Sequence, residues 1–204
     1  LRLACGLRLR EIDVLVMDVG GGALDASFLS SLIEVQDVLT KTDLSAIEVS
    51  GLWADLNTRL YEDEELCLYD RLFQNPGVSN PVDTAFALTS DRSELEATGT
   101  IDGTSMPTIV AATRASAEDL DLLIASSYAS DALNLANLSG LWRHAELARQ
   151  LELPVSQLIA LRAISGLDPF SDPAATVTFI ETVLEIRKTT FSIPQLDYLL
   201  RHQY

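Results

Sequence analysis

The sequence predicts an all-α protein built from stacked helix pairs, with one irregular insert at residues 74–107. Three observations predict this fold. A nine-residue apolar pattern recurs at a nearly constant interval, apolar residues elsewhere stand three or four apart, and turn-forming residues concentrate in one stretch. At 204 residues the chain is long enough to bury a core without disulfides or metals. We expect residues 1–204 to form a single helical segment.

The recurring pattern, called the signature here, reads apolar-x-apolar-x-(Glu/Gln/Asp)-apolar-x-x-apolar. Its copies begin at Leu7, Leu44, Ala115, Leu153 and Phe191, so successive starts are 37, 71, 38 and 38 residues apart. The first, fourth and fifth copies are the clearest. A period of about 38 residues is typical of paired-helix modules, which stack because one pair cannot bury its apolar face alone. Each copy therefore predicts a helix, a short apolar turn and a second helix.

Within each copy, the last two apolar residues stand three apart and share one face of a helix, as Leu158 and Leu161 do. Serines close to the expected helix starts are candidate N-caps, and acidic residues there suit the positive end of the helix dipole. The candidate caps are Ser116, Ser156 and Ser192, and the acidic residues include Glu11 and Asp119.

Four helices are expected before the insert. Three glycines at residues 20–22 end the first helix, and Asp25 caps the second. The expected ranges are 8–19, 26–40, 46–56 and 64–73. The second helix should bury a stripe formed by Phe28, Leu29, Leu32, Val35, Val38 and Leu39.

The insert at 74–107 fills the doubled spacing between the second and third copies of the signature. It contains Asn-Pro-Gly at 75–77, Asn-Pro at 80–81 and Asp-Gly at 102–103, a density of helix breakers that helices cannot absorb. A structureless loop of this length is unusual in a compact domain, so residues 85–88 and Leu95 should be attached to the core. A small hairpin is one form that this attachment can take.

Helices are expected again after the insert. Pro107 suits a first helical turn, Pro154 opens a later helix, and Gly166 closes it. Residues 133–135 form a short extended approach. The expected helices are 108–114, 117–126, 138–150, 154–164, 174–188 and 194–202.

The side chains that could carry chemistry are few and scattered. Cys5 and Cys67 lack metal-ligand spacing, and neither His144 nor His202 has an Asp, Cys or His partner at such spacing. The acidic run at 62–65 lacks the alternating ligands and the glycine of a calcium loop. We therefore predict no catalytic, cofactor-binding or metal-ligating residue, no cofactor and no enzymatic activity. A receptor-binding residue cannot be assigned from the sequence.

Charge and hydropathy exclude two classes of partner. The formal net charge is −16, from 30 acids and 14 bases, and this field repels nucleic-acid phosphates. We expect no nucleic-acid binding, although the helix pairs resemble helix-turn-helix units. The sequence has no run of 18 or more uncharged apolar residues, so no membrane span is expected. The chain begins at Leu1 without a signal-like stretch, and we expect it to be cut from a longer polypeptide.

Several ordered blocks of sequence resemble a known family. They are residues 68–76 (LYDRLFQNP), 80–88 (NPVDTAFAL), 138–149 (LSGLWRHAELAR), 166–170 (GLDPF) and 191–202 (FSIPQLDYLLRH). In this order they are similar to the A subunit of bacterial insecticidal toxin complexes, the TcA family. The resemblance extends over residues 7–202.

The resemblance implies that the chain is a helical-shell segment of a secreted or cell-surface toxin subunit. Subunits of this family form a bell-shaped homopentamer whose shell surrounds a translocation channel. The assembly binds a host receptor and delivers a toxic enzyme supplied by TcB-TcC type partners. The resemblance places neither the pore nor the receptor site in this segment, and it transfers no functional residue to a numbered position.

Two other functions remain open from the residues alone. The first is an acidic helical-repeat scaffold of a large secreted or surface protein, which would hold a basic partner on a concave face. The second is an enzyme with an all-helical acidic site. Pull-down of partner subunits separates the scaffold from the toxin segment, and loss of activity after changing one buried carboxylate would favour the enzyme.

Overall fold

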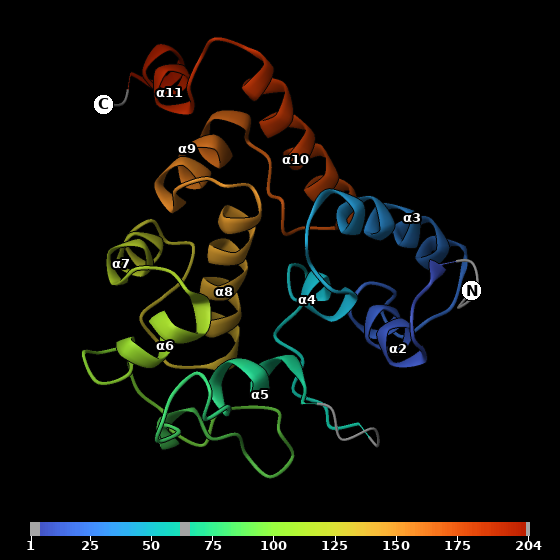
Figure 1. The fold of residues 1–204 in the computed structure, drawn as a ribbon, viewed down its shortest axis with the longest axis vertical. Helices are drawn as coiled ribbons and strands as arrows, with labels where there is room; N and C mark the ends of the chain where they lie inside the picture. Colours follow the sequence, from blue (N-terminus) through green and yellow to red (C-terminus); the bar gives the residue numbers. More distant parts are fainter. Residues whose placement is uncertain (1–4, 62–65, 203–204) are drawn as a thin grey trace. The chain divides into compact units, whose positions relative to one another are not determined.

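The structure, a computed structural model, describes residues 5–61 and 66–202, and this part of the chain is all-α (Figure 1). It contains ten α-helices, one short 3-10 helix and no β-strand. Only two isolated antiparallel bridges occur there, Leu88 with Leu95 and Thr100 with Ala132. The predicted fold class is confirmed.

The helices fall into two compact units. Unit 1 combines residues 1–53 with 147–204, and unit 2 is the continuous stretch 54–146. We expected residues 1–204 to form a single helical segment. The division into compact units does not decide whether the two units behave as one segment, so this expectation stays a prediction.

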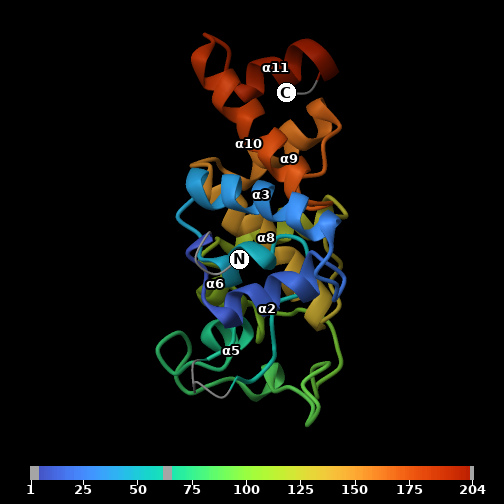
Figure 2. The same ribbon diagram turned by 90° about the vertical axis from the view of Figure 1, so that its right-hand side faces the viewer.

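Unit 1 is organised by contacts between helix pairs. Helix α10 packs on α3, α11 packs on α9, and α2 packs on α4 (Figures 1 and 2). The last two of these pairs join consecutive copies of the signature, since the two copies in each pair start 37 or 38 residues apart. The helices are α2 Leu9–Asp18, α3 Ala26–Lys41, α4 Ala46–Ser50, α9 Val155–Ser165, α10 Pro173–Lys188 and α11 Ile193–Arg201.

Most of these helices begin at a residue whose side chain caps the first turn. The Asp25 carboxylate accepts a hydrogen bond from the Phe28 amide at 2.9 Å, and Ser45 and Ser192 each form a reciprocal capping box three residues ahead. At the far end of α9, Gly166 has φ +68°, the left-handed conformation that terminates a helix. The predicted cap Ser156 is wrong, because Pro154 holds the N-cap position and Ser156 lies inside α9.

Two further details of unit 1 differ from the prediction. The third helix, expected at 46–56, ends at Ser50, because the next amides bond to carbonyls three residues back and tighten the chain into a turn. The Trp53 indole then donates to Thr176 Oγ1 at 2.8 Å, which fixes this turn to α10. In α3 the buried stripe is Phe28, Leu32, Val35 and Val38, whereas Leu29 is exposed and Leu39 half-buried.

Unit 2 packs α5 on α6 and α6 on α7. The helix expected at 64–73 starts later, at Leu68, and residues 64–65 of that prediction lie outside the described residues. The last helix starts earlier than expected, because Asn134 Oδ1 accepts from the Asn137 amide at 2.8 Å. The elements are α5 Leu68–Phe73, η1 Thr84–Phe86, α6 Met106–Thr113, α7 Ala117–Ala125 and α8 Leu135–Gln150, whose last four residues belong to unit 1.

Between α5 and α6 the chain is irregular except for η1, and one aromatic stack attaches it to the core. The Phe86 ring is fully buried and lies 5.1 Å from the Phe73 ring, which lies 5.1 Å from Tyr69. Leu95 is also buried and bridges Leu88. Two backbone hydrogen bonds, from Thr89 to Glu94 and from Glu96 to Ala87, close a short hairpin-like turn around that bridge.

Candidate functional site

A buried polar cluster of four residues, Cys67, Tyr69, Asp70 and Arg92, joins α5 to this turn in unit 2. Arg92 Nη2 donates to Asp70 Oδ1 at 2.6 Å, and its Nε donates to the Thr58 carbonyl oxygen at 2.6 Å. The Asp70 side chain is 9% exposed and that of Arg92 25%. This charge-assisted pairing satisfies an aspartate that would otherwise be costly to bury.

The neighbours of this ion pair are a thiol and a phenol. Cys67 Sγ caps α5 by accepting from the Asp70 amide at 3.4 Å, and the Tyr69 hydroxyl donates to the Phe86 carbonyl oxygen at 2.8 Å. Burial raises the pKa of the Cys67 thiol, and burial together with the Asp70 charge raises the pKa of the Tyr69 phenol. Both shifts favour the protonated forms, as is typical of a buried structural thiol and unlike an activated one.

Two exposed turns within the insert are organised by aspartates. Asp91 accepts hydrogen bonds from the hydroxyls of Thr89 and Ser93, and Asp102 accepts from the hydroxyl and amide of Thr104. Hydrogen bonds from the Thr89 and Thr104 hydroxyls, together with nearby amides, lower the pKa of these two carboxyls. Each carboxylate is satisfied within its own turn, which is a structural role.

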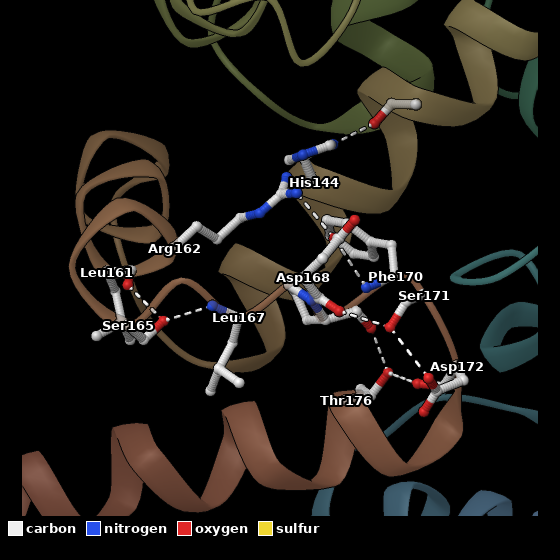
Figure 3. A network of polar contacts seen from close by, with 12 residues as sticks. His144, Leu161, Arg162, Ser165, Leu167, Asp168, Phe170, Ser171, Asp172 and Thr176 are labelled. Atoms are coloured by element: carbon white, nitrogen blue, oxygen red, sulfur yellow. Dashed lines mark hydrogen bonds and ion pairs between the residues drawn. The ribbon is translucent and has the colours of Figure 1, made fainter.

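In unit 1 the loop between α9 and α10 carries a second polar network (Figure 3). Arg162 Nη2 donates to Asp168 Oδ1 at 2.8 Å, and the Arg162 guanidinium lies 5.2 Å above the centre of the Phe170 ring. The Thr176 hydroxyl donates to the Pro169 carbonyl oxygen, and Asp172 caps α10 by accepting from the Ala175 amide. Together these contacts fix the conformation of the loop that leads from the end of α9 to the start of α10.

The structure gathers none of the candidate ligands or bases into a metal-ligand cluster within the described residues. The His144 ring is buried, its Nδ1 is 2.7 Å from the Gly140 carbonyl oxygen, and it lies against Tyr128. His202 is exposed at the end of α11, and Cys5 and Cys67 are both free thiols. Across residues 5–61 and 66–202 no three His, Cys, Asp or Glu side chains gather as metal ligands would. The acidic run 62–65 lies outside the described residues.

Sequence reasoning missed the two arginines that organise these networks. Asp70, the partner of Arg92, stands 22 residues earlier, so no local pattern connects the two residues. Arg92 also has φ +61°, a conformation unusual for a residue with a side chain, and no sequence rule predicts it. The short spacing between Arg162 and Asp168 across Gly166 was a signal that could have been used.

One further feature is a cavity of about 360 Å³ in unit 2, lined by the turn around Leu95 and the start of α8. Asp55 and Glu94 are its acidic residues, and no cationic side chain lines it. Within the described residues, no helix combines the length and the apolar character needed to cross a bilayer.

Comparison with known proteins relates the fold of the chain to solved structures. No family model matches the chain, and no curated protein matches it either. The cryo-electron microscopy structure of TcdA4 from Morganella morganii matches 86% of this chain with a TM-score of 0.63 and 20% sequence identity. The chain spans 8% of the length of TcdA4. At this identity the match shows a shared fold.

Proposed function

We propose that this chain is a helical-shell segment of a toxin-complex A subunit and that it has a scaffolding role without catalytic activity. The observation that carries the proposal is the fold: 86% of the chain superimposes on a segment of TcdA4, a TcA toxin subunit, with a TM-score of 0.63. The all-helical architecture and the family-like sequence blocks support it independently.

The family-like blocks coincide with the residues that hold the fold together. Residues 68–76 and 80–88 include Tyr69, Asp70, Phe73 and Phe86, which attach the insert to α5. Residues 166–170 form the loop that Asp168 and Phe170 organise. A scaffold explains this distribution, because the residues in these blocks are packing and loop-forming residues and not a converging set of acids and bases.

In the complete polypeptide, the segment would contribute to the outer shell of a homopentamer. That assembly would bind a host-cell receptor and, with TcB-TcC type partners, deliver a toxic enzyme into the host cell. The subunit would act outside the bacterial cytoplasm, as a secreted or surface protein.

The test is to express the complete polypeptide that contains these residues and to image it by cryo-electron microscopy. We expect pentameric particles with residues 5–202 in the shell around a central channel. Pull-down with purified TcB-TcC type subunits should recover a complex. Monomeric particles that recover only a basic protein would instead support the acidic scaffold, and no catalytic function would follow from either result.

A further inference from the structure

A groove in unit 1 between α10 and α11 has a partly apolar lining. Ile186, Phe191 and Leu196 provide its apolar surface, and its volume is about 530 Å³. Glu181 and Glu185 also line it, and they pair with Lys41 and Lys188. Phe191, just before α11, is 50% exposed, and three apolar side chains within α11 are also exposed: Tyr198, Leu199 and Leu200. Figure 2 shows α11 beside α9 at the red end of the ribbon.

The internal repeat indicates what such a surface accepts. Consecutive copies of the signature pack on each other twice in unit 1, as α2 with α4 and as α9 with α11. The longer helices repeat with the same step, since α8 and α10 each have 16 residues and begin 38 residues apart. Helix α11 therefore follows α10 as α9 follows α8, and α9 and α11 have equivalent positions in successive helix pairs.

Equivalent signature residues differ in burial between these two helices. In α9 the last two apolar positions, Leu158 and Leu161, are 0% and 1% exposed. In α11 the equivalent residues are Leu196, which is half-buried, and Leu199, which is 56% exposed. The same pattern of side chains that is buried in one copy is thus partly uncovered in the next.

We propose that this groove is a docking site for one amphipathic helix that carries the same nine-residue signature. The docked helix would pack on α11 in the way that α11 packs on α9, as one further step of the repeat. Apolar residues of the docked helix would cover Phe191 and Leu196 in the groove. The proposal rests on the repeat and not on the toxin assignment, so either can fail alone.

The test uses the full chain and a fluorescein-labelled peptide of residues 189–202, which carries the signature and is held helical by a hydrocarbon staple. Isolated helices of this length are marginal in water, so the staple removes the cost of folding the peptide. Fluorescence anisotropy should show saturable binding. A peptide with Leu196→Asp serves as the matched control and should bind at least about tenfold more weakly.

Variants of the chain locate the binding surface. Phe191→Asp should weaken binding about tenfold or more, and Phe191→Ala, which adds no charge, should weaken it in the same direction. Ile33→Asp, at a 68% exposed position on α3, should leave binding unchanged. Circular dichroism melting of each variant verifies that it is folded.

Three results would overturn the proposal. They are the absence of saturable binding, binding that Phe191→Asp does not change, and sedimentation of the unliganded chain as a dimer that Phe191→Asp dissociates. The last result would assign the groove to a second copy of the chain.

Discussion

At the scale of single residues, the Asp70–Arg92 ion pair is the contact that fixes the insert to α5. Both partners are mostly buried, and Arg92 also binds the Thr58 carbonyl oxygen, so one side chain connects three segments of unit 2. The pairing offsets the cost of burying the Asp70 charge. Loss of this ion pair should therefore destabilise the whole turn around Leu95.

Arg92→Met should lower the free energy of unfolding of unit 2 by about 2–4 kcal/mol, because Asp70 is left buried without its partner. The value is below that of a fully buried pair, since the Arg92 side chain is 25% exposed. Urea denaturation measures the loss, and hydrogen exchange should show faster opening at residues 87–96. Lys188→Met is the control: it breaks an ion pair whose partners are 69% and 70% exposed, and it should cost about 0.5 kcal/mol or less.

The buried thiol and phenol make the same cluster sensitive to alkali. The pKa values of Cys67 and Tyr69 are raised above their ordinary values of 9.0 and 10.0, so the folded state favours the protonated forms. Their contribution to stability is complete below about pH 9 and is lost as pH rises, because the unfolded chain releases these protons first. The urea midpoint should therefore fall between about pH 9 and 11.

The double variant Cys67→Ala with Tyr69→Phe is the control for this pH profile. It removes both titrating groups and should flatten the decline between those pH values, although its stability at neutral pH is lower. A decline as steep as that of the unchanged chain would show that other groups cause the alkaline response.

At the scale of elements, the signature gives the helices a clear difference between buried and exposed positions. Leu158→Asp places an unpaired charge at a site that is 0% exposed, which costs several kcal/mol and should unfold unit 1. Leu196→Asp should cost less, because Leu196 is half-buried. Thermal unfolding followed by circular dichroism measures both.

Leu199→Asp is the matched control for these two variants. It makes the same change in the same signature at a residue that is 56% exposed, and it should change stability by no more than about 0.5 kcal/mol. An equal melting temperature for Leu158→Asp and the unchanged chain would contradict the proposed core.

The helices could be predicted from the sequence wherever their cause is local. Apolar spacing and capping residues such as Asp25, Ser116 and Ser192 act within one or two turns, and these helices start where the sequence indicates. The end of α4 could not be predicted, because Trp53 bonds to a threonine 123 residues away. The ion pair of Arg92 also depends on the fold, since its backbone conformation and its partner are set by tertiary contacts.

At the scale of the whole molecule, the net negative charge determines whether the surface binds nucleic acid. With a formal net charge of −16, the chain should show no binding to random duplex DNA at physiological salt. Anisotropy of a labelled duplex measures this, with a basic DNA-binding protein as the positive control. Micromolar binding that weakens as salt rises would contradict the charge argument.

The division of unit 1 into two distant stretches of sequence determines how the protein must be made. Helix α3 leaves the ribosome long before α10, and 140 residues separate Lys41 from its partner Glu181. At roughly 5–20 residues per second, α3 waits roughly 7–28 s for the helix that it packs against. Unit 2 is synthesised as one stretch during that interval. The apolar stripe of α3 is therefore without its α10 partner during most of synthesis, although it is buried in the finished protein.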